Sequence, residues 1–464
     1  MVTDLPHRIH IVGVGGAGMS ALAKMLAGLG HEVTGSDQRG GADIAQLSDI
    51  GLDVWQGHDP EAATRAELVV ASSAVPDTDP ELRAATAAGV TVWRRPDLLR
   101  SLSAKFATIG PTGTHGKTTT TAMMIWALRA AGVDPSFVVG GELAGFGTNA
   151  HLGNDHLLVL EVDEAFGTFE HIHLEGLVVT NVEADHMDHF GSPDSIEESF
   201  IRVVENVTGP VLLCADDPGS RRVAERTGAP TYGTDPAATW RITDLTARGA
   251  TSHFTLLGPK GRAEVSIPRP GIHVARNAAG ALSLLAELGH DLEQAASGLA
   301  GFAGVRRRFE TRGRVGGVWI IDDYAHHPTE VAATLREAGQ YGSNRVWAVF
   351  QPHLYSRTLD LHREFGAALA LADGIVVTDI YGSREQPMPG VTGRLVAEAA
   401  ERAGASPVHY VPHRAEVAVH LLDLVHPGDA VVVMGAGDVT LVATELAAAL
   451  EGRHQPPITP EAGQ

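Results

Sequence analysis

A phosphate-binding loop is predicted where a strand expected at 106–110 runs into a helix. The backbone N–H groups of such a loop cradle phosphates, while Lys117 neutralises the β- and γ-phosphates and Thr118 ligates Mg²⁺. Pro111 stands where the strict GxxxxGK[ST] pattern has its first glycine. The strand, loop and helix order still favours ATP or GTP binding over a purely structural loop. The loop consists of Gly113, Thr114, His115, Gly116, Lys117, Thr118 and Thr119.

Carboxylates and imidazoles follow the next two expected strands, 157–162 and 177–181. Glu161, Asp163 and Glu164 end the first, within LEVDEAFGTFE, and TNVEADHMDHF follows the second. Open parallel sheets place ligand sites at the carboxyl ends of their strands, and carboxylate oxygens are suited to Mg²⁺. We therefore predict Glu161 and His186 as metal ligands, with the other polar residues supporting them from behind.

A second glycine loop lies near the start of the chain, in IVGVGGAGMS. Gly13, Gly15 and Gly18 match GxGxxG between a strand and a helix, and acidic Asp37 ends the next strand. Such a loop presents N–H groups and a helix N-terminus to a diphosphate. On this motif alone a structural turn, a dinucleotide site and a UDP site all remain open.

The last third of the chain repeats the arrangement of polar groups after buried strands. IDDYAHHPTE follows one expected strand, and FQPHLYSRT follows the next. Two such clusters at equivalent positions of one sheet predict a site, although a single histidine is more often structural. Between the glycine loops and these clusters lie Asn277, at an expected helix start, and three consecutive arginines, of which at most two can reach a site: Arg306, Arg307 and Arg308.

The elements that position these residues alternate between short apolar strands and Ala-rich helices, which predicts parallel sheets covered by helices. The fold class is α/β with three domains. They are an N-terminal Rossmann-like domain over 1–103, a central P-loop ATPase domain with a mostly parallel sheet over 104–309, and a C-terminal Rossmann-like domain over 310–452. Closely spaced strands over 239–267 predict an antiparallel edge, and the Pro-rich polar residues 453–464 predict a disordered tail.

Composition limits the classes of function. The chain has 464 residues and a formal net charge of -21, which disfavours nucleic-acid binding. No apolar run is long enough to predict membrane insertion, and the single Cys214 suits a reducing compartment, so a cytoplasmic location is expected. Monomer and homodimer both remain open.

Taken in order, these motifs closely resemble the Mur ligase family over nearly the whole chain, and within it the members that add L-alanine. The resemblance rests on IHIVGVGGAGMSALA, GTHGKTTTT, TNVEADHMD, DDYAHHPTEV, QPHLYSRT and VVVMGAGDV. It implies an enzyme with UDP-N-acetylmuramate, L-alanine and ATP as substrates and Mg²⁺ as cofactor. The muramyl carboxylate would attack the γ-phosphate of ATP, and the alanine amine would capture the acyl phosphate.

The resemblance also implies roles for individual residues. The catalytic residues would be Lys117, His186, His326 and Arg357, and Mg²⁺ would lie on Thr118, Glu161 and His186. In addition to the phosphate loop, Asn277 would contact the adenine of ATP. Arg308, Asp323 and His326 would complete the ATP site when the domains close. The amino acid would contact Tyr324, His353 and Arg357. The UDP substrate would be held by Gly15, Gly16, Ala17, Gly18, Met19, Asp37 and Ser72.

One segment departs from the family pattern. LEVDEAFGTF stands where the family usually reads like EADESDGSF, so Val162, Ala165 and Phe166 differ. A ligase that acts on a related muramyl or natural-product substrate is therefore the alternative within the class. An NAD-dependent oxidoreductase and a catalytically silent nucleotide-binding regulator are the alternatives from other classes.

Overall fold

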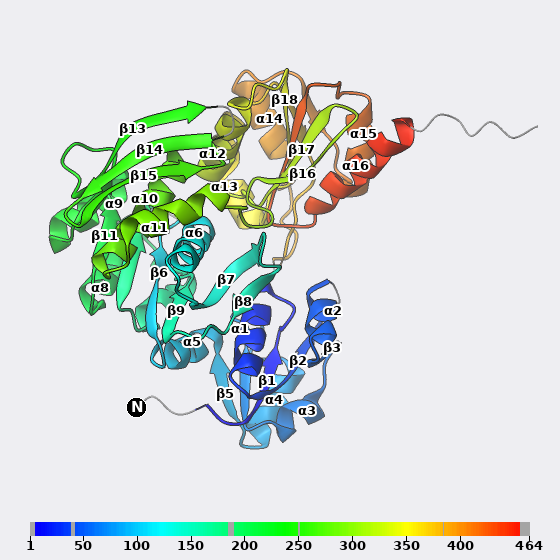
Figure 1. The fold of residues 1–464 in the computed structure, drawn as a ribbon. Coiled ribbons are helices and arrows are strands. Elements are labelled where there is room, and N and C mark those ends of the chain that lie inside the picture. The colour runs from blue at the N-terminus through cyan, green and yellow to red at the C-terminus, as the bar shows by residue number, and fades with distance from the viewer. Residues whose placement is uncertain (1–4, 39–41, 184–189, 249–250, 384, 455–464) are drawn as a thin grey trace, which may run out of the picture. The chain divides into compact units, whose positions relative to one another are not determined.

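The computed structural model describes residues 5–38, 42–183, 190–248, 251–383 and 385–454. Its chain divides into two compact units, residues 1–303 and 304–464. Three sheets, of five, ten and six strands, carry the helices (Figure 1).

The first sheet has the strand order β3-β2-β1-β4-β5, and every neighbouring pair is parallel. This is the order of a Rossmann-like mononucleotide unit, so the predicted fold of this region is confirmed. The expected strand at 9–14 ends at Val12, because the chain turns at Gly13, whose φ is +81°. The elements are β1 Arg8–Val12, α1 Ala17–Gly28, β2 Glu32–Asp37, α2 Ala42–Asp49, β3 Asp53–Gln56, α3 Pro60–Arg65, β4 Leu68–Ala71, α4 Pro80–Ala87, β5 Thr91–Arg94 and α5 Arg95–Ser103.

The second sheet belongs to the same unit and has the order β15-β14-β13-β12-β11-β10-β6-β9-β7-β8. Along this order, every neighbouring pair from β13 through β12, β11, β10, β6 and β9 to β7 is parallel. Strands β14, β15 and β8 are antiparallel to their neighbours. The mostly parallel sheet and the antiparallel edge near 239–267 are confirmed. Strands β6, β9 and β10 form the centre and are almost wholly buried, which fixes the loops at their carboxyl ends.

The elements of the second sheet are β6 Ala107–Thr112, α6 Lys117–Ala130, β7 Ser136–Leu143, β8 Thr148–His151, β9 Leu157–Leu160, η1 Ala165–His171, β10 Gly176–Val179, α8 Pro193–Asn206, β11 Val211–Cys214, α9 Pro218–Thr227, β12 Thr231–Gly233, β13 Trp240–Arg248, β14 Thr251–Gly258, β15 Gly261–Ile267, α10 Ile272–Glu287, α11 Leu292–Gly298 and η2 Leu299–Gly301.

The third sheet forms the second unit, with the order β16-β17-β21-β18-β19-β20. Only β16 is antiparallel to its neighbour. Apolar clusters on both faces, one around Phe350 and one around Val433, show that helices cover the sheet on two sides. The elements are β16 Glu310–Val315, β17 Val318–Asp323, α12 Pro328–Gly339, β18 Val346–Phe350, α13 Tyr355–Leu369, β19 Gly374–Val377, α14 Arg394–Arg402, β20 Val408–Tyr410, α15 Arg414–Leu422, β21 Ala430–Met434 and α16 Thr440–His454.

Within the described residues, no helix is both long enough and apolar enough to cross a bilayer. Most of the predicted tail, residues 455–464, lies outside the described residues.

Candidate active site

The phosphate loop joins β6 to α6, and its two glycines are required by geometry. Gly113 has a φ of +128°, and a Cβ there would lie 2.3 Å from Oγ1 of Thr180. Gly116 has a φ of +82° and is the N-cap of α6. Only glycine adopts such angles without strain. Pro111 lies within β6, and its carbonyl accepts a hydrogen bond from Val162 N–H. The strand thus occupies the position of the first glycine of the strict motif, and Gly113 makes the turn instead.

The end of β10 anchors this loop. The Asn181 side chain accepts a hydrogen bond from His115 N–H at 2.8 Å and donates one to the His115 carbonyl at 2.9 Å. The Thr180 hydroxyl donates to the same carbonyl at 2.7 Å. The loop is therefore held in place by side chains of the neighbouring strand end, so that its N–H groups are preorganised for an anion.

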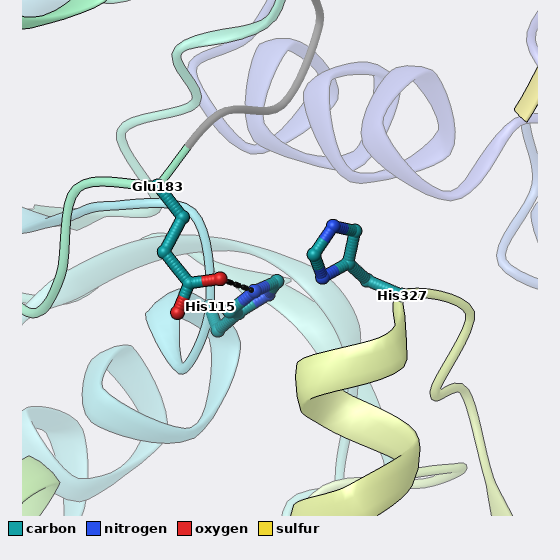
Figure 2. Close-up of side chains that lie close together, drawn as sticks. All are labelled: His115, Glu183 and His327. Carbon is teal, nitrogen blue, oxygen red and sulfur yellow. Dashed lines mark ion pairs between the residues drawn. The ribbon is translucent and has the colours of Figure 1, made fainter. Parts of the chain in front are cut away.

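His115 also pairs with Glu183, as Figure 2 shows, with its Nε2 3.4 Å from the carboxylate oxygen. The backbone N–H of Glu183 donates to the Thr114 hydroxyl at 2.9 Å. Glu183 thus binds the loop through both its backbone and its side chain.

Lys117 begins α6 and is surrounded by oxygen atoms. Its ammonium group lies 2.8 Å from a carboxylate oxygen of Glu164 and 3.9 Å from one of Asp163, and it donates to the Gly113 carbonyl at 2.7 Å. Burial lowers the pKa of Lys117, but the charges of Glu164 and Asp163 outweigh it and raise the pKa above its usual value. Lys117 therefore carries a fixed positive charge beside the loop.

Thr118 and Glu161 provide paired oxygen donors. The Thr118 hydroxyl donates to Oε1 of Glu161 at 2.9 Å, and Oε2 of Glu161 accepts from Gly140 N–H at 2.8 Å. A hydroxyl and a carboxylate this close to a phosphate loop match the oxygen ligands that Mg²⁺ prefers. The third predicted ligand, His186, lies outside the described residues.

Asn277 lies against the phosphate loop, since a Cβ at Gly116 would be 2.9 Å from its Oδ1. The helix α10 begins at Ile272, so Asn277 is in its second turn and not at its start as expected. Gly271, with a φ of +122°, is the N-cap of the helix. Thr119, in the first turn of α6, is half-buried.

In the N-terminal loop, Asp37 closes the turn that the glycines make. Its Oδ2 accepts a hydrogen bond from Gly15 N–H at 3.0 Å. The Gly16 and Ala17 positions are exposed at the start of α1, whereas the Met19 side chain is buried in the core. Met19 can therefore offer a ligand only its backbone. Ser72, after β4, is half-buried. A Cβ added at Gly13 would lie 3.0 Å from the Cβ of Ser72.

Arg95 links the two halves of the first unit. Its guanidinium carbon would lie 3.3 Å from a Cβ at Gly18, and its Nη1 lies 3.6 Å from Oδ2 of Asp163. A cation thus stands between the N-terminal glycine loop and the carboxylates around Lys117.

In the second unit, Asp323 ends β17 in a buried position. Its carboxylate accepts hydrogen bonds from the N–H groups of Phe309 and Ala325, both at 2.7 Å. Burial raises the pKa of Asp323 to about 6, against the opposing charge of Arg308. Arg308 lies over the Tyr324 ring, with 5.0 Å from its guanidinium carbon to the ring centre.

The two predicted clusters of the second unit come together although β21 separates their strands. The rings of His326 and His353 have centres 6.0 Å apart, and Tyr324 contacts His326 edge to face at 5.2 Å. Nδ1 of His326 lies 3.0 Å from the Tyr324 carbonyl, which can only accept, so Nδ1 carries the proton and Nε2 a lone pair. Burial lowers the pKa of His326 to about 4, with Arg357 acting in the same direction against Glu330. Arg357 lies in the first turn of α13.

The sequence did not predict Arg95. It placed Glu164 and Asn181 within recognised motifs, but not their roles as the partner of Lys117 and the anchor of the loop. Arg95 follows a short strand in TVWRRPD and matches no phosphate motif.

The fold and these residues define a class: an α/β protein of three sheets with a phosphate loop for a nucleoside triphosphate and a second glycine loop on a Rossmann-like sheet. Family models match throughout the chain: the Mur ligase family catalytic domain over 8–107, the Mur ligase middle domain over 112–285, and the Mur ligase glutamate ligase domain over 307–437. The chain belongs to the Mur ligase family.

The individual relatives that match this chain are also ligases by name. A UDP-N-acetylmuramate--L-alanine ligase of Mycolicibacterium vanbaalenii is 44% identical, over 97% of this chain and 98% of the relative. The crystal structure of the UDP-N-acetylmuramate-alanine ligase of Thermotoga maritima matches with a TM-score of 0.83 at 27% identity, covering 96% of this chain and 99% of that one. A murein peptide ligase from Psychrobacter arcticus matches over the same shares, with a TM-score of 0.73 at 25% identity. Family membership decides against the oxidoreductase interpretation.

Proposed function

We propose that this chain is an ATP-dependent ligase that joins UDP-N-acetylmuramate to L-alanine, acting in the cytoplasm. The observation that carries the proposal is a phosphate loop in which Lys117 pairs with Glu164 and Thr118 with Glu161, in a chain similar to L-alanine-adding ligases over nearly its whole length. The N-terminal glycine loop, with Gly15 to Met19, Asp37 and Ser72, would hold the UDP diphosphate.

The reaction would proceed in two balanced steps. A carboxylate oxygen of the muramyl group attacks the γ-phosphorus of ATP, the bond to the β-phosphate oxygen breaks, and ADP leaves. The alanine nitrogen then attacks the acyl carbon, inorganic phosphate leaves, and the nitrogen loses a proton. Phosphoryl transfer of this kind depends on positioning and charge neutralisation.

Residues of this chain supply both the positioning and the charge neutralisation. The N–H groups of the loop over 113–119 bind the phosphates, and Lys117 neutralises their developing charge. Thr118 and Glu161, with His186, would hold Mg²⁺, which supplies positive charge to the phosphate oxygens. Asn277 would contact the adenine, and Arg308 and Asp323 would contribute to the ATP site.

The acceptor amine is the second requirement. Neutral His326 has a lone pair on Nε2 and can accept the proton that the amine loses. Arg357 would bind the carboxylate of the amino acid bidentately, as a planar guanidinium does, beside His353 and Tyr324.

Isotope transfer tests this route. With UDP-N-acetylmuramate labelled with ¹⁸O in its carboxylate, one labelled oxygen should appear in the released phosphate, because the acyl phosphate carries it. Phosphate without label would overturn the acyl phosphate step.

A further inference from the structure

A cluster of histidine and carboxylate side chains lies in the N-terminal domain, outside the residues assigned to the reaction. It joins His58, which follows β3, to Asp79, the N-cap of α4, and to Glu81 in the first turn of α4. Helices α3 and α4 pack together beside this cluster, and Figure 1 shows both on the N-terminal sheet. We propose that His58, Asp79 and Glu81 bind a zinc ion or a similar borderline divalent cation.

The spacing of the donor atoms suits a tetrahedral ion. Nδ1 of His58 lies 3.6 Å from Oδ2 of Asp79 and 3.4 Å from Oε2 of Glu81. Zinc bonds of about 2.0–2.1 Å to nitrogen and oxygen place neighbouring ligands of a tetrahedron about 3.3–3.4 Å apart. These two separations need only small adjustments, and all three ligand atoms lie within 4.8 Å of one another. The His58 side chain is 30% exposed, so the cation can enter from solvent and keep a water as its fourth ligand.

The charges at the site also call for a cation. Asp79 and Glu81 are 4% and 0% exposed, and within the described parts of the chain their ion pairs are with histidines alone. Glu81 accepts hydrogen bonds from the Ser36 hydroxyl at 2.6 Å and from the Asp59 N–H at 2.7 Å. Two buried carboxylates this close together need a compensating positive charge.

A second, independent observation comes from His10 in β1. Its imidazole is fully buried and stacks on Trp55 with ring centres 5.7 Å apart. Nδ1 bonds the Thr34 hydroxyl at 2.8 Å, whereas Nε2 points at Oε1 of Glu81 from 3.4 Å without a hydrogen bond of good geometry to any described residue. This buried polar atom is aimed into the cluster, where a shift of Glu81 onto a cation would let it act as a supporting group.

His58 has the support that metal-binding histidines usually have. Its Nε2 lies 3.2 Å from the Gln38 side-chain amide. The oxygen and nitrogen of an amide are assigned by their surroundings. With the Gln38 oxygen turned to face His58, Nε2–H would donate to it and the Nδ1 lone pair would face the carboxylates of Asp79 and Glu81, the arrangement that orients histidine ligands.

Zinc titration of the full-length protein against a chromophoric chelator, in excess Mg²⁺, tests this site. Wild type should bind one zinc ion per chain. His58→Ala and Asp79→Asn should weaken that binding at least about tenfold, the lower end of losses seen even for supporting residues. Asparagine is as good a helix N-cap as aspartate, so Asp79→Asn keeps α4 capped.

Two controls place the ion. His7→Ala removes an exposed histidine of the same domain that lies 4.0 Å from Glu32, and Glu183→Gln removes the carboxylate beside His115. Both should keep the zinc, and Co²⁺ should give tetrahedral absorption in the wild type and these controls but not in His58→Ala. No stoichiometric zinc in the wild type, or equal affinity in His58→Ala and wild type, would overturn the proposal.

Discussion

At the scale of single residues, Lys117 makes the sharpest prediction about ATP. Its charge is fixed beside the loop by Glu164 and Asp163. Lys117→Ala should lower kcat by at least about a hundredfold, the usual size of a lost electrostatic contact in a transition state. ADP release measures this, and Lys260→Ala, at an exposed turn, is the matched control. Near-normal turnover in Lys117→Ala would refute the assignment of the loop.

Glu161 makes the corresponding prediction for Mg²⁺. Its contact with the Thr118 hydroxyl places two oxygen donors together, and loss of the carboxylate leaves a hard cation with one ligand fewer. Glu161→Ala should raise the Mg²⁺ concentration needed for half-maximal activity, whereas Glu205→Ala, exposed on α8, should not. Equal Mg²⁺ titrations in the two variants would argue against the site.

His326 makes a prediction about pH. Burial lowers its pKa to about 4, so the imidazole should stay neutral at neutral pH. In the unfolded chain the imidazole binds a proton below about pH 6.5, whereas in the folded protein it does so only near pH 4. Protonation therefore favours the unfolded chain, and the protein should lose stability as the pH falls from about 6.5 towards 4. In NMR spectra of labelled histidine, the signal absent in His326→Gln should not titrate above about pH 5. Arg357→Ala should raise this pKa, since the arginine charge lowers it. A midpoint near 6.5 would contradict the burial of the His326 imidazole.

At the scale of elements, the junction of β6 and α6 depends on the backbone of Gly113. Gly113→Ala would force a left-handed region on alanine and press its Cβ into Thr180. Gly132 also has a positive φ, +80°, but no atom within 4 Å of its would-be Cβ. Gly113→Ala should therefore abolish ATP binding measured by calorimetry, while Gly132→Ala should cost only about 1 kcal/mol of stability. Equal ATP affinities would show that the turn is not required.

The elements also show what sequence could predict. The buried strands of the centre were predicted because Val/Ile/Leu runs such as LLVL and VLLC are unambiguous. Polar or short strands were missed. β3 reads DVWQ and β16 reads ETRGRV, and both owe their conformation to pairing with a neighbouring strand rather than to a local pattern.

For the site residues too, local motifs could be predicted from the sequence, whereas contacts made by packing could not. Motifs identified the phosphate loop, and the rule that ligands gather at strand ends led to Glu161 and to the histidines of the second unit. The partner of Lys117 could not be predicted, because Asp163 and Glu164 are adjacent and only the fold decides that Glu164 lies closer. Arg95 could not be predicted because its role depends on packing between two sheets.

At the scale of the whole molecule, three sheets from two compact units each carry polar groups at strand ends. We propose that one group binds a UDP diphosphate, one binds ATP with Mg²⁺, and one binds the amino acid. Of the three residues that depart from the family pattern, Val162 follows β9, and Ala165 and Phe166 begin η1. A change of muramyl substrate or acceptor is the alternative they raise.

ADP release from the wild-type chain with UDP-N-acetylmuramate and a panel of amino acids tests the central claim most directly. L-Alanine should give the highest turnover, with glycine and L-serine competing partially, because one methyl group contributes only about 1–3 kcal/mol of discrimination. Leucine and phenylalanine should be poor acceptors. No ADP with UDP-N-acetylmuramate and L-alanine, together with ADP from another acceptor or UDP-sugar, would contradict the proposed substrates.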